Sequence, residues 1–483
     1  MSFSVSAGHS KTAEAAELIL REGGNAVDAA IAAFLMSWVA EPCMSSAGGG
    51  GFALVQMAGT KPLLLDFFCQ TPGKKRRLAE SDFYPTTVDF GDTREVFHIG
   101  MGSTGVPGAV NGLFELYEQH GSLPLKELFQ PAIQAAGEGV SVNSFQALDF
   151  QLLEPILAVD PKAQAVFFPE GRLIQRGEVL YMPKQADFLE YLWRAGKRAF
   201  YEGEIAQKIV VDYASGGGHL EASDFKQYQS IWRKPLVQDY KNYQIYTNPL
   251  PSLGGVRIGW FLEQLSRVTA RPELRGAAHL QTLVSAFDFV RAQEKTVGTG
   301  LHGSTTHFSI IDHKGNAVSL TASNGEGCGY FIDGTDVQLN NMLGEAALLP
   351  AGFHSWEPNT RLSSLMAPTM IFKKEDLKLS LVTGSSGAGR IPYSIAQVIY
   401  YFLDFGLDID QAVNEARMHW QENCWNLEPG FKFDPERLFA EAEYKVWKQS
   451  SLYFGGVNSV SFLNGITRAG VDRRREGAGV DID

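Results

Sequence analysis

Apolar positions with a helical period predict two helices near the start of the chain. Residues 13–21 carry this spacing and are followed by Gly23 and Gly24, which stop helices. Residues 26–39 are apolar on nearly every face, as in a fully buried helix, and Asn25 before them is a suitable N-cap. The same pattern predicts helices over 109–119, 123–136, 256–267, 279–293 and 392–404, and two more within 185–213.

Shorter apolar runs predict strands. Residues 52–56, 243–247 and 379–383 have the length of core strands. Residues 305–312 alternate, four turn-forming residues follow, and 317–323 return, which predicts a β-hairpin. Since helices and strands come in blocks rather than in strict alternation, the pattern favours packed antiparallel sheets flanked by helices.

Composition and charge exclude several classes of protein. The 483 residues include 54 acidic and 42 basic side chains, giving a net charge of −12. Nucleic acid is therefore not an expected partner, and the one dense basic run, residues 74–77, is too short to bind it. The apolar run 26–40 is shorter than the roughly 20 residues of a membrane span. The four cysteines are scattered, which indicates reduced thiols rather than disulfides or a metal site.

Four isolated motifs have better structural than catalytic interpretations. Residues 298–303 fit GxGxxG but follow a predicted helix instead of a strand, so dinucleotide binding is not favoured. Residues 384–388 nearly fit the GxSxG elbow, yet position 388 is alanine and no His or acidic partner is evident. Cys328 is more typical of a small buried residue than of a nucleophile, and His307 of a packed or hydrogen-bonded histidine than of a metal ligand.

The segment before the predicted hairpin allows a more specific hypothesis. Residues 297–304 contain three glycines and end at Ser304, and Thr305 begins the strand. This arrangement suits an N-terminal-nucleophile hydrolase, in which the Thr305 hydroxyl attacks the Ser304 carbonyl and hydrolysis frees a new amino terminus. The freed α-amine, with an ordinary pKa of roughly 7.7–8.0, can then act as base for the same hydroxyl. By itself the pattern is weak and is more typical of a plain β-hairpin.

Eight sequence blocks resemble, in order, the signature blocks of the γ-glutamyltransferase family (γ-glutamyltranspeptidase, glutathione hydrolase). The resemblance extends from about residue 6 to the region of Asp472 and Arg473. The blocks are GGNAVDAA (23–30), GGGGF (48–52), PSLGG (251–255), TTHFS (305–309), GNAVSLT (315–321), LNNM (339–342), RLSS (361–364) and TGSSG (383–387).

The resemblance implies an α+β fold: a four-layer αββα sandwich of the N-terminal-nucleophile hydrolase superfamily. Length alone would suggest about three domains. The family instead implies one domain over residues 1–483, self-cleaved between Ser304 and Thr305. The expected products are a large subunit, 1–304, and a small subunit, 305–483, intertwined as a heterodimer that can oligomerise further.

Site residues follow from the same resemblance, position by position. Thr305 matches the nucleophile, and Ser323 matches the hydroxyl residue, usually Thr, that holds it. Gly387 and Ala388 match the Gly-Gly pair whose amide N–H groups form the oxyanion hole. The substrate-binding positions are Ser363 and Ser364 for the α-carboxylate of the γ-glutamyl group, and Asn324 and Glu345 for its α-amine.

Two departures from the family pattern affect the expected substrate. The usual Arg-Glu-x-Ala-Pro block reads Phe-Cys-Gln-Thr-Pro at 68–72, and Arg77 is the residue assigned to bind the α-carboxylate. Met342 replaces a Gln. Only 22 positions separate Asn341 from Ser363, too few for the long lid loop of some members, so an open cleft is expected.

The expected function is transfer of a γ-glutamyl group from a glutathione-like donor to water or to an amino-acid or peptide amine, with no metal or organic cofactor. Two alternatives stay open: an acylase of different acyl specificity on the same scaffold, and an unprocessed binding homologue without the chemistry. Residues 1–10 lack the features of a secretory signal, which indicates a cytoplasmic protein, or a periplasmic or secreted one if a leader has been trimmed.

Overall fold

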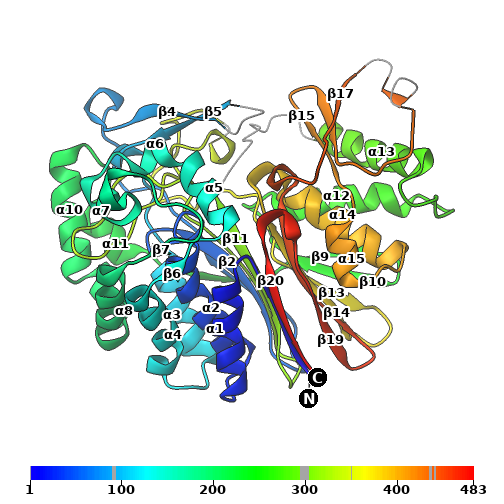
Figure 1. The fold of residues 1–483 in the computed structure, drawn as a ribbon, viewed down its shortest axis with the longest axis horizontal. Helices are drawn as coiled ribbons and strands as arrows, with labels where there is room; N and C mark the ends of the chain where they lie inside the picture. The colour runs from blue at the N-terminus through cyan, green and yellow to red at the C-terminus, as the bar shows by residue number, and fades with distance from the viewer. Residues whose placement is uncertain (1, 90–93, 294–303, 350, 435–437, 440–441) are drawn as a thin grey trace.

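The protein has four layers, with two β-sheets between two groups of helices (Figure 1). The computed structural model describes residues 2–89, 94–293, 304–349, 351–434, 438–439 and 442–483. The two ends of the chain lie side by side, because the first and last strands pair antiparallel. This is the αββα arrangement that the resemblance implied.

The first sheet holds the predicted hairpin at its centre. Its strands are all paired antiparallel, in the order β20-β1-β11-β12-β2-β3-β8. Their bounds are β20 (Ala478–Ile482), β1 (Phe3–Ala7), β11 (Thr305–Ile311), β12 (Ala317–Ser323), β2 (Gly50–Gln56), β3 (Leu63–Phe67) and β8 (Ile231–Arg233). The hairpin therefore forms as expected, but it is completed by strands from both ends of the chain.

The second sheet faces the first and is antiparallel throughout, in the order β19-β18-β14-β13-β10-β9. Its strands are β19 (Ile466–Gly470), β18 (Gly456–Leu463), β14 (Leu379–Ser386), β13 (Thr369–Lys373), β10 (Tyr243–Thr247) and β9 (Leu236–Tyr240). Hydrogen bonds link the sheets: Ser309 Oγ donates to the Asn458 carbonyl at 3.0 Å, and Ser319 Oγ to the Thr383 carbonyl at 2.9 Å.

The outer helices cover the two sheets from opposite sides (Figure 1). Those beside the first sheet are α1 (Ser10–Arg21), α2 (Ala26–Ala40), α3 (Ala109–His120), α4 (Leu125–Glu138), α5 (Ser144–Leu152), α6 (Glu154–Leu157), α7 (Pro161–Phe167), α8 (Pro183–Ala195), α9 (Arg198–Tyr201), α10 (Glu204–Gly216) and α11 (Ala222–Gln227). Those beside the second are α12 (Gly254–Ser266), α13 (Ala277–Gln293), α14 (Ile391–Asp404) and α15 (Ile409–Asn414).

Two strand pairs and one small three-stranded sheet lie outside the main sheets in the described part of the chain. They are β4 (Tyr84–Asp89) with β5 (Arg94–Ile99), β6 (Val140–Ser141) with β7 (Val179–Leu180), and the small sheet β15 (Met418–Gln421), β16 (Cys424–Leu427) and β17 (Glu443–Val446).

Helix α2 shows why a nearly featureless apolar run is stable here. All of its residues are buried, and Asn25 caps it by accepting from the amides of Val27 and Asp28. It packs with the first sheet in one apolar cluster, while α12, α13 and α14 pack with the second sheet in another. Each helical layer therefore has its own core.

The run Gly48–Gly51 leads into β2 through a crowded place. A Cβ on Gly49 would lie 2.4 Å from the Ser323 carbonyl oxygen, so only glycine fits there. Close backbone approach is thus the reason for this run, which brings β2 against the end of β12 where Ser323 lies.

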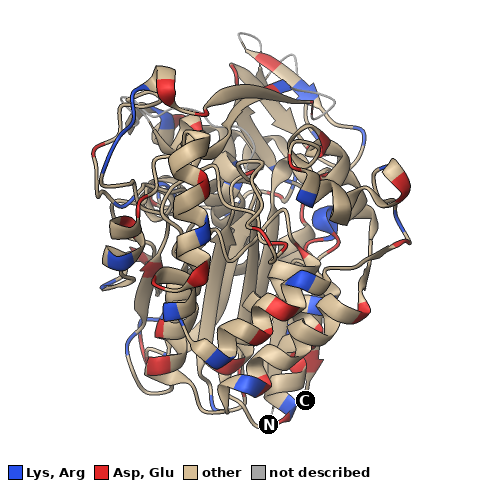
Figure 2. Cartoon of the chain, turned by 90° about the vertical axis from the view of Figure 1, so that its left-hand side faces the viewer, with Lys and Arg blue, Asp and Glu red and all other residues tan. Residues whose placement is uncertain are grey.

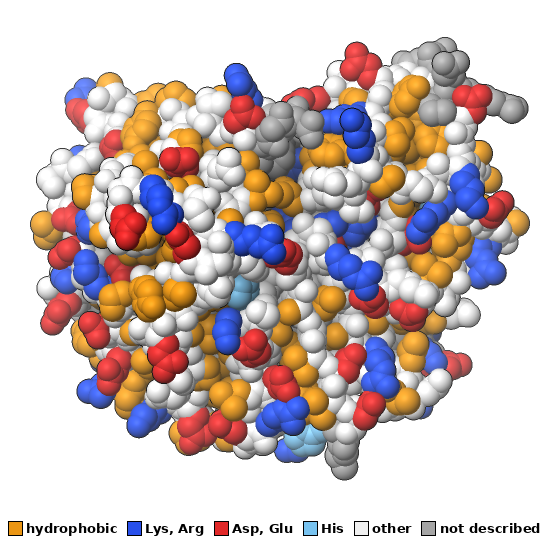
Figure 3. Space-filling view, in the orientation of Figure 1, with side chains coloured by type: hydrophobic (Ala, Val, Ile, Leu, Met, Phe, Trp, Pro, Cys, Tyr) orange, Lys and Arg blue, Asp and Glu red, His pale blue; other side chains and the backbone are white. Residues whose placement is uncertain are grey.

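Charged side chains of both signs are interspersed over the helical layer beside the first sheet (Figure 2). The same mixture covers the face of the molecule that is turned to the viewer in Figure 3. No helix among the described residues is long and apolar enough to cross a membrane.

Candidate active site

Thr305 begins β11 at the centre of the first sheet. It is 5% exposed and pairs across the hairpin with Ser323, the last residue of β12. Ser323 Oγ donates to the Ser304 carbonyl oxygen at 2.6 Å and accepts from the Gly325 amide at 3.0 Å. A hydroxyl thus polarises the carbonyl at the predicted cleavage point.

The turn after β14 carries the predicted oxyanion pair. Gly387 has a φ of 112° and Ala388 a φ of 46°, so both adopt the left-handed conformation. For an alanine this conformation costs roughly 1–2 kcal/mol, a strain often found at functional sites. Helix α14 begins three residues after Ala388, and its positive N-terminal end favours negative charge at this turn.

A cavity here called the Thr305 cavity brings together five of the predicted site residues: Thr305, Ser323, Glu345, Ser364 and Ala388. The rest of its lining is Phe68, Met342, Ala347, Leu348, Leu365, Met366, Gly389 and Ile391. The wall is therefore mostly apolar, and its lining includes no Lys, Arg or His.

Two buried polar side chains near this cavity lack partners among the described residues. They are Glu345, through Oε1, and Asn324, through both polar atoms of its amide. Burial raises the pKa of Glu345 well above its ordinary value. Unpaired buried groups of this kind are costly unless a ligand satisfies them.

The two predicted carboxylate-binding serines differ in position. Ser364 lines the Thr305 cavity, and its Oγ accepts from the Met366 amide at 3.1 Å. Ser363 is half-buried and donates to the Pro251 carbonyl at 2.8 Å. Only Ser364 borders the cavity.

Arg77 is not brought to the cavity, which corrects the sequence-based assignment. Its side chain is 84% exposed and pairs with Glu80, three residues away on the surface. The altered block does lie beside the serines, since the Leu362 amide donates to the Cys69 carbonyl at 3.1 Å, but the residue that it presents to the cavity is Phe68. The sequence spacing selected Arg77 for this role, but the structure places its side chain on the surface, away from the cavity.

Arg361 does not supply the missing cation. It is 9% exposed, lies 3.6 Å from the Asp66 carboxylate and donates to the Tyr228 hydroxyl and the Phe68 carbonyl. These contacts fix the backbone behind the cavity wall.

A second cavity, here called the Ser304 cavity, adjoins the same peptide bond. Its lining is Met44, Phe145, Asp149, Leu152, Leu153, Ser304, Glu326, Gly387, Arg390, Leu452 and Arg475. The cavities share no lining residue, and Ser304 and Gly387 face one while Thr305 and Ala388 face the other. The predicted cleavage point and the predicted oxyanion pair thus border both cavities.

Carboxyl groups in the Ser304 cavity have raised pKa values. Burial raises the pKa of Glu326 to about 7, and burial together with the Glu326 charge raises that of Asp149 to about 8. Glu326 Oε2 accepts from Ser304 Oγ at 2.7 Å, while its Oε1 has no partner among the described residues.

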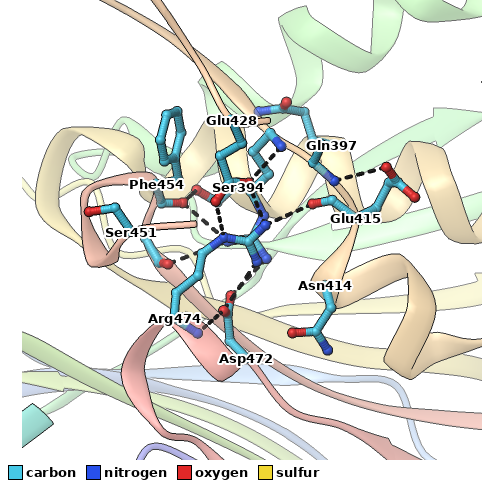
Figure 4. Close-up of polar contacts among 12 residues, drawn as sticks. Ser394, Gln397, Asn414, Glu415, Glu428, Ser451, Phe454, Asp472 and Arg474 are labelled. Carbon is cyan, nitrogen blue, oxygen red and sulfur yellow. Dashed lines mark hydrogen bonds and ion pairs between the residues drawn. The ribbon is translucent and has the colours of Figure 1, made fainter. Parts of the chain in front are cut away.

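Arg475 supplies positive charge to this cavity from a well-anchored segment. The preceding residue, Arg474, donates to Glu428 at 2.7 Å and to Asp472 at 3.2 Å (Figure 4). Arg417 donates to Asp472 at 2.7 Å. Burial lowers the pKa of Arg475 to about 10, so it stays protonated at neutral pH.

His307 and Cys328, for which the sequence favoured a structural over a catalytic role, are both buried. His307 is hydrogen-bonded to Thr321 Oγ1 at 2.8 Å and Ser309 Oγ at 3.0 Å, and burial lowers its pKa to about 3. Cys328 is buried, and burial raises its pKa. All four cysteines are free. Residues 298–303 lie outside the described residues, among which no group of three or more His, Cys, Asp or Glu is arranged to hold a metal.

Sequence reasoning missed most of the residues around the predicted cleavage point. Phe68, Leu348 and Met366 come from segments with no chemical signature of their own. Glu326 and Arg475 lie 21 and 170 positions beyond Thr305 in the chain. The one available signal was the replaced block at 68–72, which pointed to a changed pocket without showing that Phe68 faces it.

Comparisons with known proteins agree with this geometry. The γ-glutamyltranspeptidase family model matches residues 12–300 and 290–482. The glutathione hydrolase proenzyme of Escherichia coli is 28% identical over 89% of this chain and 83% of its own length. The acylase ACY 1 proenzyme of a Pseudomonas species is 29% identical over 94% of this chain and 88% of its own.

A solved structure extends the likeness to the whole fold. Cephalosporin acylase from Bacillus halodurans superposes with a TM-score of 0.85 over 99% of this chain and 95% of its own, at 24% identity. That similarity concerns the fold. With the family model matching almost the entire sequence, this chain belongs to the γ-glutamyltranspeptidase family.

Proposed function

We propose that this protein is a self-processing N-terminal-threonine enzyme that transfers a γ-glutamyl group from a glutathione-like donor to water or to an amine. The products of processing are residues 1–304 and 305–483, held together as a heterodimer. Both subunits contribute to the first sheet, since β11 and β12 lie between β1 and β2, so the two parts remain intertwined.

Maturation begins with the Thr305 hydroxyl attacking the Ser304 carbonyl carbon. Ser323 stabilises the developing negative charge through its hydrogen bond to that carbonyl oxygen. The C–N bond breaks as the Thr305 nitrogen takes a proton, leaving an ester. Water then cleaves the ester and yields a carboxylate on Ser304 and a free amine on Thr305.

Turnover repeats this chemistry on a bound amide. The α-amine of Thr305 takes the proton of its own hydroxyl, which attacks the donor carbonyl, and the amides of Gly387 and Ala388 stabilise the oxyanion. The amine half leaves with the proton. Water or a second amine then attacks the acyl-Thr305 ester and restores the hydroxyl.

One observation carries the proposal. Ser323 Oγ lies 2.6 Å from the Ser304 carbonyl oxygen, and the cavity that Ala388 lines is also lined by Ser323 and Thr305. In a plain β-hairpin these features would have no reason to coincide.

Intact-mass analysis tests it. The wild-type 53.0 kDa chain should convert to two fragments divided between Ser304 and Thr305. Thr305→Ala should stay whole and inactive. Thr306→Ser, a matched change at the next residue that keeps the hydroxyl donating to Glu41, should be cleaved. A wild-type chain that stays whole would support the unprocessed binding homologue instead.

The Thr305 cavity favours a second candidate, an acylase acting on a different acyl group. Phe68 and Met342 line the wall, and the lining contains no basic side chain to hold an α-carboxylate. Comparing turnover of γ-glutamyl, glutaryl and uncharged acyl anilides decides between the two. Activity on uncharged acyl donors together with failure on every γ-glutamyl donor would establish the acylase.

A further inference from the structure

The turn that follows β12 holds Ser304 at two points. Ser323 Oγ donates to the Ser304 carbonyl oxygen at 2.6 Å, and Glu326 Oε2 accepts from Ser304 Oγ at 2.7 Å. The Gly325 amide donates to Ser323 Oγ at 3.0 Å. The Glu326 amide donates to Asn341 Oδ1 at 2.8 Å, and a Cβ on Gly325 would clash with that oxygen. The Glu326 carboxyl is therefore held in a fixed position beside the predicted cleavage point.

Glu326 is a buried acid with unused hydrogen-bonding capacity. Its side chain is 2% exposed, and its Oε1 has no partner among the described residues. The Ser304 cavity, which it lines, also contains Asp149, Arg390 and Arg475. Burial raises the pKa of Glu326 to about 7, while the Arg475 charge acts in the opposite direction. Near neutral pH the carboxyl therefore exists in both protonation states, as suits a group that transfers protons.

Two other titratable side chains near this bond have different partners. His307 lies two residues after Thr305, but both of its ring nitrogens are hydrogen-bonded within the sheet, and burial lowers its pKa to about 3. Glu41 uses its two carboxyl oxygens on threonine hydroxyls that belong to neither Ser304 nor Thr305. Among the described residues, Glu326 is thus the titratable side chain that contacts Ser304.

The proposed self-cleavage needs a proton donor at this bond. After the Thr305 hydroxyl attacks the Ser304 carbonyl carbon, the Thr305 nitrogen must gain a proton before it can leave. The Ser304 hydroxyl belongs to the same residue as that carbonyl, and serine side chains commonly hydrogen-bond to neighbouring backbone groups. A proton can therefore pass from the Glu326 carboxyl to Ser304 Oγ, while the Ser304 hydroxyl proton passes to the departing nitrogen.

We propose that Glu326 supplies the proton for self-cleavage and that the Ser304 hydroxyl relays it to the Thr305 nitrogen. This inference rests on the proposed function. The bond from Thr305 Oγ to the Ser304 carbonyl carbon forms, the C–N bond breaks, and the nitrogen keeps the relayed proton. The Thr305 hydroxyl releases its own proton to water, and Glu326 regains one from water, so the protons balance over the step.

The rate of cleavage tests the proton donor. Glu326→Gln keeps an oxygen that can accept from Ser304 Oγ but cannot give a proton near neutral pH, and it should slow cleavage about 10²-fold. Intact mass followed over time after cell-free synthesis measures the rate, and thermal unfolding shows that each chain is folded. Asp149→Asn is the matched control, because it neutralises an acid of the same cavity that has no hydrogen bond to Ser304 among the described residues. It should slow cleavage far less.

Ser304→Ala tests the relay with a change that leaves Glu326 in place. It should slow cleavage by a factor similar to that of Glu326→Gln. The two changes combined should be no slower than either alone, because both remove the same proton path. Slowing that multiplies in the combined variant would mean that the two residues act independently, and would overturn the proposal.

The pH dependence of cleavage separates proton transfer from a structural role. The wild-type rate should fall as the pH rises through about 7, because the protonated form of Glu326 is lost, and the residual cleavage of Glu326→Gln should lack this fall. Neutral hydroxylamine, which cleaves esters, should not accelerate Glu326→Gln, since its ester has not formed. Rescue by hydroxylamine would place the action of Glu326 after the ester and overturn the proposal.

Cleavage of Glu326→Gln at the wild-type rate, or equal slowing in Asp149→Asn, would overturn the proposal while leaving the proposed function intact. A wild-type chain that stays whole would instead contradict the proposed function, and this inference with it.

Discussion

The two cavities that adjoin the Ser304–Thr305 bond differ in the charge and polarity of their linings. The Thr305 cavity is mostly apolar and includes Glu345, whose pKa is raised well above its ordinary value by burial. The Ser304 cavity contains two acids and two arginines. Both face the same turn, which contributes Ala388 to one and Gly387 to the other.

Under the proposed function, this difference separates the residues that would act on the amide from those that would recognise the substrate. The former lie where the cavities meet, and they coincide with residues that the family resemblance identified. The cavity walls are where this chain departs from the family pattern, with Phe68 in the altered block and Met342 in place of a Gln. Chemistry and specificity can therefore change independently.

The largest effect on the rate of self-cleavage is expected from Ser323, where the two cavities meet. Ser323→Ala removes the hydrogen bond to the Ser304 carbonyl and should slow self-cleavage by about 10²–10³-fold, the usual loss for one oxyanion donor. Intact mass followed over time after synthesis measures it. Ser323→Thr keeps the hydroxyl and should process at nearly the wild-type rate. Equal cleavage rates in the wild type and Ser323→Ala would remove Ser323 from the mechanism.

A smaller effect is expected from adding a positive charge to the mostly apolar wall of the Thr305 cavity. Phe68→Arg places a guanidinium in the wall of the cavity proposed to hold the donor, and a charged hydrogen bond to its α-carboxylate would contribute about 1.5–3 kcal/mol. The ratio of γ-glutamyl to uncharged acyl anilide turnover should rise about tenfold or more.

Phe68→Leu, which keeps an apolar wall, is the control for that experiment, and cleavage of both variants shows that they fold. An unchanged ratio in a cleaved Phe68→Arg protein would mean that the acyl group does not contact position 68.

The smallest effect is a pH dependence of stability from the Ser304 cavity. Burial raises the Asp149 pKa to about 8, so the folded protein keeps a proton that the unfolded chain releases near its ordinary pKa of 3.8. The resulting stability is full below about pH 4 and is lost as the pH rises towards 8.

Asp149→Asn removes this dependence. The Tm of the variant relative to wild type should therefore increase by about 2–5 °C between pH 5 and pH 8. Thermal unfolding at several pH values measures it, with exposed Glu154→Gln as control. A Tm difference that is constant with pH would contradict the raised pKa.

Sequence periodicity predicted the elements that frame the site. The buried helix α2, its Asn25 cap and the hairpin of β11 and β12 all form where expected, since each depends on local spacing and on residues next to it. Within 185–213 the pattern predicted two helices, whereas α8, the short α9 and α10 are present, because a single turn such as Arg198–Tyr201 has too little periodicity to detect.

Arg77 shows that the position of a residue in the sequence does not predict whether its side chain lines the cavity. It lies nine residues after Phe68, and spacing cannot tell which of the two side chains turns inward. The chain leaves the cavity wall after Cys69, pairs with the segment around Thr360, and then reaches the surface, where Arg77 meets Glu80.

By itself the sequence determined the family, the hairpin and the residue types that can act on an amide, because these depend on motifs read along the chain. Tertiary structure alone decided which side chains meet around Thr305. Glu326, Arg475 and Phe68 come from distant segments, brought together because the two sheets bury their apolar faces against separate helical layers. The charge and shape of each cavity are therefore consequences of packing, which no local pattern contains.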